Sequence, residues 1–395
     1  MRLQYVPLFI MLLVNILVDG YIYVALHSYF RRIIWSKIHL VFSALLVALF
    51  VCIVTFPVRS GSNGLLQSMM WMVFTYLSIY FAKYVFVVFD VLSRIPAIFR
   101  RQRWHWMSVL GAVSGFGLFA LMWWGALFNR YNLDVRQVDV VGKDIPQAFD
   151  GFKIAQISDL HLGTFGSDTS FVCNLVGEIN ALNPDMVVFT GDLVNRKSAE
   201  AEPFIYALSK ISAKYGVYSV LGNHDYGDYA DWDSPEAKEA DVRNMVELQK
   251  RMGWRLLNNE CVPIARGRDT LMVIGVENVG DPPFHSYGDL AKAYATPGDS
   301  RFKVLLSHNP AHYDLDIQNK DNMNVSLTLS GHTHAMQAEL FGWSPCVFRY
   351  KHWGGMYTDS LSQRMYVNIG AGTVGMPARI GATPEITLLT LRCQK

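Results

Sequence analysis

The sequence predicts two structural classes in one chain: an α-helical transmembrane domain of about four helices, followed by a soluble α/β domain. Apolar and aromatic residues dominate the first part of the 395-residue chain, whereas the remainder has the composition of a soluble protein. In that remainder, short apolar runs alternate with helical patterns, which is typical of an α/β domain. We therefore divide the chain into a transmembrane domain at 1–130, a linker with a first strand at 131–151, and a second domain at 152–395.

Four segments are long enough to cross a bilayer, which requires about 20 mostly apolar residues. They run roughly from Val6 to Tyr29, His39 to Phe56, Leu65 to Leu92 and Trp106 to Phe128. The first is not expected to be a cleavable signal peptide, because its apolar core is long and no small-x-small site precedes Arg31. Asp19 and Lys83 lie within or near these spans, where ionisable groups are costly. We expect them to lie near an interface or to pair with each other, and a transporter function would rest on them alone.

The basic residues of the transmembrane domain predict its orientation. They are concentrated in two links, the one after the first span and the one after the third. These links contain Arg31, Arg32 and Lys37, and Arg94, Arg100, Arg101 and Arg103. Only Arg2 precedes the first span, and only Arg59 follows the second. Because cytoplasmic loops carry the excess of Lys and Arg, we expect both basic links to be cytoplasmic and the α/β domain to be extracytoplasmic.

Net charge and cysteine content exclude two further classes. The formal net charge is +2, which is too small to indicate a nucleic-acid partner. The five cysteines include no Cys-x-x-Cys pair, so a zinc ribbon is not expected. Free or buried thiols are the expected state, and a disulfide among the last four would require an oxidising compartment. Those four are Cys173, Cys261, Cys346 and Cys393.

Apolar runs predict the elements of the α/β domain. We expect a strand opening at Lys153 and further strands at Val135–Val141, Met186–Thr190, Gly216–Leu221, Leu271–Val276, Lys303–Leu306, Val325–Leu329, Met365–Ile369 and Ile386–Leu391. Helical spacing predicts helices at Phe171–Asn180, Pro203–Lys214 and Ala237–Met252. Two Gly-rich stretches, Glu277–Ser300 and Ser344–Asp359, predict long surface loops, which often border a substrate site.

Possible metal ligands follow five of these apolar runs. The stretch that begins at Lys153 ends with Asp159 and His161, and side chains at i and i+2 share one side of an extended backbone. Four later segments supply similar groups after an apolar run: Asp192, Asn223 to Asp225, His308, and His332 with His334. Ligands in α/β domains lie at the carboxyl ends of strands. Mixed imidazole and carboxylate ligands suit Mn, Fe, Zn or Co and disfavour Ca or Mg.

The five motifs together resemble the calcineurin-like metallophosphoesterase superfamily. They read Asp159-Leu-His161, Gly191-Asp192-Leu-Val-Asn195-Arg196, Gly222-Asn223-His224-Asp225, Ser307-His308-Asn309-Pro310 and Gly331-His332-Thr-His334. The resemblance extends from about Lys153 to Leu391, and the tail around Gly370 and Arg379 is similar to the bacterial membrane-tethered branch. It implies a four-layer α/β sandwich. Asn195 departs from the family, in which many members carry a second Asp, and this departure bears on the orientation of Arg196.

The resemblance also implies the roles of individual residues. One ion would be held by Asp159, His161, Asp192 and His334, and the other by Asp192, Asn223, His308 and His332. The cofactors would be two divalent transition-metal ions, with Mn favoured, and a hydroxide bridging them would attack a phosphomonoester or phosphodiester. His224 would protonate or hydrogen-bond the departing oxygen. Asp225 would hold the His224 imidazole in the required tautomer.

The implied protein is a phosphoesterase of the bacterial cytoplasmic membrane with an extracytoplasmic catalytic domain. Its expected partners are the lipid bilayer and a phosphate-ester substrate, for which a lipid-linked ester is compatible with the membrane anchor. One alternative is a pyrophosphatase of a nucleotide-linked lipid precursor of the UDP-diacylglucosamine type, which requires a cytoplasmic domain. Another is a catalytically silent, metal-stabilised interaction module.

Several other residues have expected places. Arg196 is expected to be structural, His312 to face solvent or cap a helix, and His285 and His352 to lie on the surface. For Arg379 the sequence leaves open whether the side chain faces the site. Four glycines beside the ligands are expected to form tight turns. They are Gly163, Gly191, Gly222 and Gly331.

Overall fold

The structure, a computed structural model, describes residues 5–30, 33–57, 59–280, 285–294, 301–320 and 324–394. Arg2, Arg31 and Arg32, which entered the orientation prediction, and parts of the predicted loop up to Ser300 lie outside the described residues. The chain forms two compact units, which we call the helical unit and the α/β unit. The helical unit comprises 1–58, 68–127 and 376–378, and the α/β unit comprises 59–67, 128–375 and 379–395.

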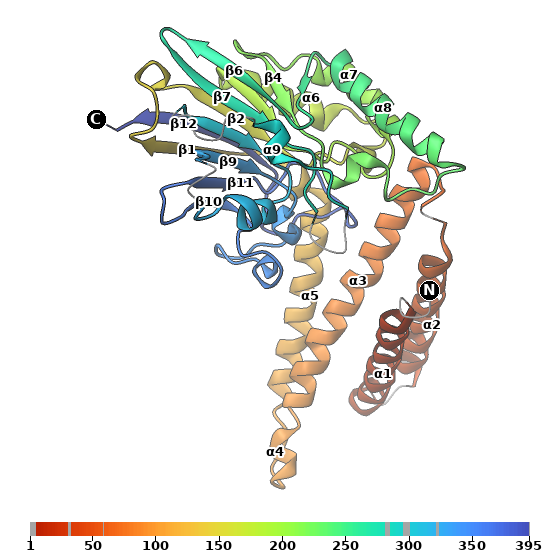
Figure 1. The fold of residues 1–395 in the computed structure, drawn as a ribbon. Coiled ribbons are helices and arrows are strands. Elements are labelled where there is room, and N and C mark those ends of the chain that lie inside the picture. The colour runs from red at the N-terminus through yellow and green to blue at the C-terminus, as the bar shows by residue number, and fades with distance from the viewer. Residues whose placement is uncertain are drawn as a thin grey trace. The chain divides into compact units, whose positions relative to one another are not determined.

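Four long apolar helices and one short helix are described in the helical unit (Figure 1). They are α1 (Tyr5–Tyr29), α2 (Ile34–Thr55), α3 (Asn63–Leu92), the short α4 (Ile95–Ile98) and α5 (His105–Leu127). Among the described residues, four helical segments are long and apolar enough to cross a membrane: Val6–Tyr29, Ile34–Thr55, Asn63–Ile98 and His105–Tyr131. The prediction of about four spans is therefore confirmed.

Two buried carboxylates in the helical unit, Asp19 and Asp90, are paired. Lys83 Nζ donates a 2.6 Å hydrogen bond to Asp19 Oδ1, and the Tyr80 hydroxyl donates a 2.8 Å hydrogen bond to Asp19 Oδ2. The expected pairing of Asp19 with Lys83 is confirmed. Asp90, which is fully buried, accepts hydrogen bonds from Tyr21 and Arg103. Paired charges of this kind are tolerated inside a bundle because each one supplies the other's missing solvation.

In the part of the α/β unit that the structure describes, the strands form two six-stranded sheets. The first has the order β1-β12-β2-β3-β4-β5, with strands at Asp134–Gly142, Glu385–Cys393, Lys153–Ile157, Met186–Phe189, Val217–Ser219 and Arg255–Leu256. The second has the order β10-β11-β9-β8-β7-β6, with strands at Gly355–Thr358, Arg364–Val367, Leu327–Ser330, Lys303–Leu306, Asp269–Gly275 and Glu260–Arg266. Strands β2 to β5 are parallel neighbours, as are β7, β8, β9 and β11.

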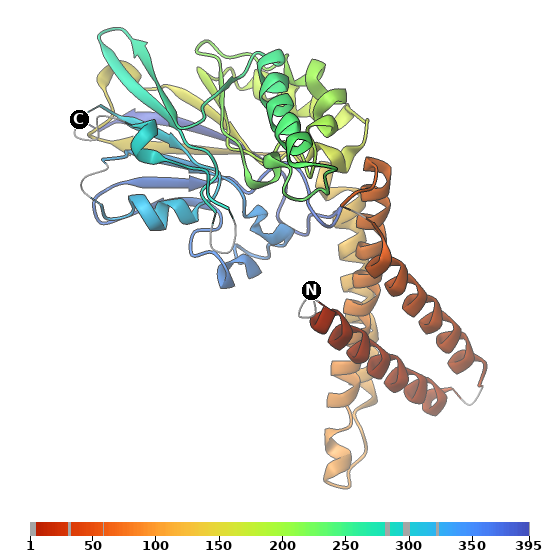
Figure 2. The same ribbon diagram turned by 45° about the vertical axis from the view of Figure 1, so that its right-hand side comes forward.

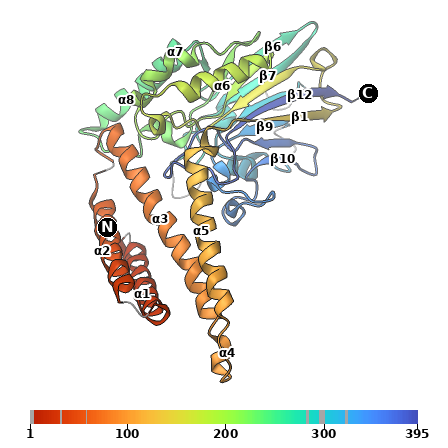
Figure 3. The same cartoon turned by 180° about the vertical axis from the view of Figure 1, so that it is seen from behind.

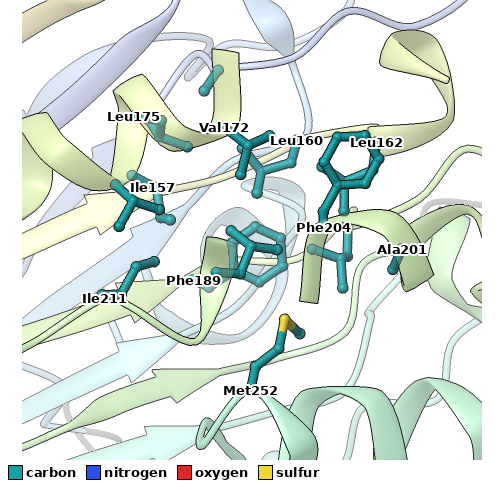
Figure 4. Packing of buried hydrophobic residues seen from close by; sticks show 14 of the residues in the cluster. Ile157, Leu160, Leu162, Val172, Leu175, Phe189, Ala201, Phe204, Ile211 and Met252 are labelled. Atoms are coloured by element: carbon teal, nitrogen blue, oxygen red, sulfur yellow. The ribbon is translucent and has the colours of Figure 1, made fainter. Parts of the chain in front are cut away.

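Alternating side chains on these strands divide the interior into layers. On β3, Val187 and Phe189 pack with Val172 and Leu175 of α6 (Ser170–Ala181), as Figure 4 shows in part. The helices α7 (Ile205–Leu208) and α8 (Pro235–Arg251) cover the same face of the first sheet, as seen in Figures 2 and 3. Full burial of such side chains contributes about 1.5–3 kcal/mol each.

The other faces of the two sheets complete the layers. Val188 of β3 lies in one core with Val304 of β8, so the two sheets pack face to face. Ile274 of β7 lies in another core with Leu290 of α9 (Leu290–Ala293) and with Tyr313 of a π-helical turn at Tyr313–Ile317. The order is helices, sheet, sheet, helices, which confirms the predicted four-layer sandwich.

Most predicted elements are present, and the differences have physical reasons. The predicted helix at Pro203–Lys214 is largely wrong, because α7 ends at Leu208. The Asn180 side chain donates to the Lys210 carbonyl and accepts from the Ser212 amide, both at 2.9 Å, and holds the following segment as a loop. Strands β5, β6 and β10 were not predicted. β6 is an edge strand with Pro263 inside it, which is permitted only at an edge.

Candidate metal centre

The predicted ligands lie in turns that follow β2, β3, β4, β8 and β9. Five of them have a left-handed backbone, with φ of 54° at Asp159, 45° at His161, 61° at Asp192, 73° at His332 and 49° at His334. This conformation is uncommon for residues other than glycine and costs about 1–3 kcal/mol per residue. It corrects the expected extended backbone of the Asp159–His161 pair, since β2 ends at Ile157. Strain of this size persists where the surroundings or a bound group compensate for it.

Four side chains form the first group of ligand atoms. His161 Nε2 lies 3.0 Å from His334 Nε2 and 3.5 Å from Asp192 Oδ2, and His334 Nε2 lies 3.2 Å from Asp159 Oδ1. One donor atom from each of the four lies within 4.8 Å of the others. All four residues are buried.

A second group shares Asp192 with the first. His308 Nε2 lies 3.3 Å from Asp192 Oδ2, 3.1 Å from His332 Nδ1 and 3.1 Å from Asn223 Oδ1. The structure therefore brings the seven predicted ligands together, with Asp192 common to both groups. The sequence places them up to 175 residues apart, and the two sheets bring their carboxyl ends to one place.

The donor atoms fit metal ions. His308 Nδ1 lies 2.7 Å from the Thr190 carbonyl oxygen, so Nδ1 carries the proton and Nε2 presents a lone pair to the cluster. His332 Nε2 lies 2.8 Å from the Tyr350 hydroxyl, which leaves Nδ1 for the cluster. Imidazole nitrogens about 3 Å apart around shared carboxylates suit a transition metal better than an oxygen-preferring Ca or Mg ion. These residues fit a pair of transition-metal ions.

Burial and mutual charge determine the protonation of this cluster. Burial lowers the pKa of His161 well below its ordinary value and lowers that of His332 to about 3. Burial also acts to lower the pKa of His308, but the surrounding acceptors, of which the Asp192 carboxylate is the strongest, together outweigh burial and raise that pKa to about 9. For Asp192, burial acts to raise the pKa, but the neighbouring imidazoles, with His308 the strongest, together outweigh burial and hold the pKa well below its ordinary value. Neutral imidazoles and ionised carboxylates are the metal-binding forms, so His308 must lose a proton on binding.

His224 lies at the edge of the ligand cluster. Its ring centroid is 4.9 Å from that of His161, and its ring stacks on Tyr229 at 4.0 Å. Nδ1 lies 2.7 Å from the Asn195 carbonyl oxygen, which accepts the Nδ1 proton. The Tyr229 hydroxyl in turn accepts a 2.9 Å hydrogen bond from the Asn223 amide. His224 is thus held in one tautomer by a backbone carbonyl and in one plane by an aromatic ring.

Asp225 has a different role from the expected one. The prediction that its carboxylate orients the His224 imidazole is wrong, because both carboxylate oxygens accept hydrogen bonds from backbone N–H groups. The donors are Gly222, Asp192, Leu193 and Val194, at 2.9, 2.9, 2.8 and 3.2 Å. These amides belong to the turns after β3 and β4, and the Asp225 carboxylate accepts their hydrogen bonds. Burial and the neighbouring Asp192 charge raise the pKa of Asp225 to about 7.

The glycines beside the ligands serve two purposes. Gly191 has a φ of 96° and forms the expected turn. At Gly331 the reason is close approach, because a Cβ would lie 1.9 Å from Ser158 Oγ and 2.3 Å from Asp159 Oδ2. Gly163 and Gly222 are likewise crowded by side chains and lack the left-handed backbone of a turn glycine.

Two arginines that the sequence singled out are buried. Arg379 Nη2 is 3.2 Å from His334 Nδ1 and donates to the Gly372 carbonyl at 2.6 Å, so this side chain reaches the back of the ligand cluster. Arg196 lies 3.5 Å from Glu200 and donates to the carbonyl oxygens of Gly61 and Ser62, which fits the expected structural role.

The structure corrects two of the predicted surface histidines. His312 is 1% exposed, with Nδ1 2.8 Å from Ser307 Oγ and Nε2 3.4 Å from Asp316 Oδ2, so it neither faces solvent nor caps a helix through its side chain. His352 is buried, and its Nδ1 lies 3.1 Å from Asp314 Oδ1. His285 is exposed, as predicted.

Two tyrosines of the centre were not singled out from the sequence. Tyr229 follows the Gly222–Asp225 motif by four residues, and no periodicity marks it. Tyr350 lies in the stretch Ser344–Asp359, which was predicted to border a substrate site, and that prediction was the only sequence signal for it. Both act through contacts that only the folded chain creates.

Two family models match the chain. A model described as "Calcineurin-like phosphoesterase" matches residues 152–336, and one described as "Probable Calcineurin-like phosphoesterase, transmembrane domain" matches residues 2–130. The first covers the turns with all seven predicted ligands. The second covers the four long apolar helices.

Curated relatives agree with both matches. The metallophosphoesterase YkuE of Bacillus subtilis is 32% identical over 258 residues, which cover 63% of this chain and 82% of YkuE. The "Transmembrane protein with metallophosphoesterase domain" of Danio rerio is 32% identical over 65% of this chain and 57% of its own length. The metallophosphoesterase Cj0846 of Campylobacter jejuni is 26% identical over 98% of both chains.

A solved structure of a dimetal phosphatase from Danio rerio aligns with 57% of this chain and 90% of its own, at 11% identity and a TM-score of 0.33. A similarity of that size carries no argument. The family models, the relatives and the ligand cluster lead to one conclusion. The chain belongs to the calcineurin-like metallophosphoesterases and joins a metal-dependent phosphoester hydrolase domain to a four-helix membrane domain.

Proposed function

We propose that this membrane protein hydrolyses phosphomonoesters or phosphodiesters at a dinuclear metal site. One ion would be held by Asp159, His161, Asp192 and His334, and the other by Asp192, Asn223, His308 and His332. The observation that carries the proposal is the convergence of these side chains, with one Asp192 oxygen 3.5 Å from His161 and 3.3 Å from His308. A carboxylate between two groups of imidazoles is the arrangement that a pair of cations requires.

Two bound metal ions supply an activated water at neutral pH and neutralise the phosphate charge that builds up during displacement. The chain's own residues hold the reacting groups in place. Asp159 and Asp192 balance the charge of the site, and Asp225 holds the turn that carries Asp192 through its backbone amides. Asn223 contributes an uncharged oxygen, which keeps the site electrophilic.

His224 would assist the departure of the leaving group. Its Nδ1 proton is engaged by the Asn195 carbonyl, so Nε2 is the atom available to a substrate oxygen. When the ring is protonated, Nε2 would donate a proton or hydrogen bond to the departing oxygen, while Nδ1 stays bonded to the carbonyl at 2.7 Å. The stacked Tyr229 restricts rotation of the ring.

The decisive test uses the full chain, purified in detergent, stripped of metal and reloaded. We expect hydrolysis of bis-p-nitrophenyl phosphate with Mn, which we propose as the native ion, and loss of at least two orders of magnitude in Asp192→Ala and His332→Ala. The matched control is His285→Ala, which removes an exposed imidazole outside the cluster and should retain full activity. A wild-type chain that binds two metal ions and remains inactive would favour the interaction-module hypothesis.

We further propose that the catalytic domain is extracytoplasmic in the bacterial cytoplasmic membrane. Support comes from the basic link after α3, which contains Arg94, Arg100, Arg101 and Arg103. An alkaline phosphatase reporter fused after Lys395 should be active, and a fluorescent protein at the same point should be dark. The reverse pattern would place the domain in the cytoplasm and favour the alternative, a pyrophosphatase of nucleotide-linked lipid precursors.

A further inference from the structure

One segment of the α/β unit exposes apolar side chains where a soluble domain would bury or replace them. We call this segment, Met336–Phe348, the apolar wedge. Its exposed apolar residues are Met336 (45%), Leu340 (62%), Phe341 (99%), Trp343 (53%), Val347 (43%) and Phe348 (84%). Exposed apolar residues scattered singly are ordinary, but a contiguous group indicates a surface that another molecule covers.

The backbone at the tip of the wedge gives an independent reason. Leu340 and Trp343 exchange backbone hydrogen bonds of 2.8 and 3.0 Å, which closes a two-residue turn. Both central residues are left-handed, with φ of 51° at Phe341 and 76° at Gly342. Such turns favour Asn, Asp or Gly, and a bulky residue there is strained. Neither turn preference nor packing within the described part of the α/β unit explains a phenylalanine that is 99% exposed, which indicates a partner outside that unit.

The base of the wedge is held rigidly. Ser344 Oγ donates to the Ala335 carbonyl at 2.6 Å, and the Glu339 amide donates to the Ile380 carbonyl at 2.8 Å. Cys346 is fully buried between the exposed residues. A firmly anchored base with an exposed apolar tip presents its side chains without the entropy loss of ordering a loose loop.

The wedge is continuous with the metal centre. It begins two residues after the ligand His334 and ends two residues before Tyr350, whose hydroxyl lies 2.8 Å from Nε2 of the ligand His332. The carbonyl of Trp353, just beyond, accepts a 2.6 Å hydrogen bond from the Thr333 hydroxyl, between the two ligand histidines. The chain on both sides of the wedge is therefore tied to residues of the metal centre.

Charge and composition identify the partner as a lipid surface. Arg349 and Lys351, which immediately follow the wedge, are exposed, whereas the one acidic residue within it, Glu339, lies 3.9 Å from Arg136. Exposed Trp and Phe side chains beside Lys and Arg are typical of proteins at the bilayer interface. There the aromatic rings lie between the headgroups and the acyl chains, and the cations bind anionic headgroups. The four membrane-spanning helices keep the chain at a bilayer throughout its life.

We infer that the apolar wedge inserts into the bilayer surface and presents the metal centre to phosphate esters of amphiphiles embedded there. The inference rests on the proposed phosphoesterase function for its substrate class. The insertion itself can be measured without any activity. Insertion predicts lipid around the Phe341 ring, whereas association of two copies would place protein there.

The first experiment identifies, by photo-crosslinking, the molecules that contact the wedge. The full chain, with p-benzoylphenylalanine at Phe341, is reconstituted in vesicles of phosphatidylcholine and phosphatidylglycerol and irradiated, and adducts are weighed by mass spectrometry. The matched control places the same group at Tyr206, an aromatic residue that is 75% exposed on α7. We expect at least ten-fold more lipid adduct at 341 than at 206. Equal lipid adducts at both positions, or adducts between two protein copies at 341, would overturn insertion.

The second experiment tests the substrate class. In the double variant Phe341→Ser, Phe348→Ser, we expect at least a ten-fold lower kcat/KM for phosphatidic acid in vesicles and a change of less than two-fold for soluble p-nitrophenyl phosphate. Tyr206→Ser should alter neither. An equal loss on both esters would overturn the role of the wedge in substrate access, and wild-type activity on the soluble ester alone would overturn the lipid substrate class. A wild-type chain inactive on both esters would refute the proposed function, while the adducts would still report insertion.

Discussion

At the scale of single residues, the centre relies on backbone groups where the family pattern suggested side chains. The Asn195 carbonyl accepts the His224 Nδ1 proton, and the Asp225 carboxylate serves backbone amides. The Asn195 side chain donates to the His161 carbonyl at 3.1 Å instead of contacting the imidazole. The amide at position 195 is therefore compatible with a correctly oriented His224.

His224→Gln should reduce turnover by about 10²-fold or more for phenyl phosphate, because a poor leaving group needs a proton as it departs. The loss for p-nitrophenyl phosphate should be much smaller, because that leaving group is stable as an anion. Steady-state kinetics on the two esters provides the comparison, with metal content measured alongside. Equal losses on both esters would argue that the ring only shapes the site.

Asp225→Asn should destabilise the α/β unit by about 2 kcal/mol or more, because charged acceptors give hydrogen bonds of about 1.5–3 kcal/mol and the new amide group faces N–H donors. Chemical denaturation of the full chain in detergent measures this loss. Unchanged stability with an altered pH profile of kcat would instead restore the tautomer-holding role that the sequence suggested.

The seven ligands could be predicted because each belongs to a short motif directly after an apolar run. Tyr229 and Tyr350 could not, since their contacts depend on how the loops fold over the ligands. The buried state of His312 and His352 also escaped prediction. Their partners Asp316 and Asp314 are ordinary charged residues of a short π-helical turn, and nothing in the sequence marks them.

At the scale of elements, the strongly apolar strands were predictable and the weakly apolar ones were not. β3, β8 and β12 are buried along most of their length and read as apolar runs. β5 has two residues and β10 is only half-buried, so neither has a recognisable pattern. The left-handed turns that carry the ligands were also beyond sequence reasoning, because Asp and His have no preference strong enough to indicate them.

Gly331→Ala should displace the Asp159 carboxylate, because the new Cβ would lie 1.9 Å from Ser158 Oγ and 2.3 Å from Asp159 Oδ2. We expect loss of one bound metal ion per chain and of at least about ten-fold in activity, comparable with the loss of an outer partner of a ligand. Metal content by plasma mass spectrometry checks the first expectation.

Gly177→Ala is the matched control for that substitution. Gly177 lies within α6, and beyond the backbone of its own helix no atom lies within 4 Å of the place that a new Cβ would take, so alanine meets open space. The substitution should leave metal content unchanged and stabilise the helix by about 0.5–1 kcal/mol. A loss of metal in both variants would indicate a general sensitivity of the fold in place of a local collision.

At the scale of the whole molecule, the segment between α2 and α3 belongs to the α/β unit. Residues 59–67 are part of that compact unit, Gln67 Nε2 donates to the carbonyls of Gly163 and Thr164 at 3.3 Å, and Arg196 donates to Gly61 and Ser62. This segment must therefore lie on the same side of the membrane as the metal centre. Two spans, α3 and α5, separate this segment from the rest of the α/β unit, and an even number of crossings returns the chain to the same side.

Arg196→Ala should be strongly destabilising, by about 3–5 kcal/mol, because it leaves the buried Glu200 carboxylate without its charge partner. The control is Arg59→Ala, which removes an exposed ion pair with Asp231 in the same segment and should cost less than about 1 kcal/mol. Denaturant midpoints of the two variants give the comparison. Similar denaturant midpoints for the two variants would contradict the prediction. They would show that the Glu200 carboxyl becomes protonated at little cost in stability when Arg196 is absent.

The position of β12 has a consequence for biosynthesis. β12 lies between β1 and β2, pairing with β1 from Asp134↔Glu385 to Gly142↔Cys393 and with β2 on its other edge. The strand nearest the membrane anchor cannot join its sheet until residues some 250 positions later have left the ribosome. Newly made chains thus wait at the membrane with an open sheet edge. A chain that ends before Glu385 would lack the strand that joins β1 to β2, and we expect such a chain to be degraded.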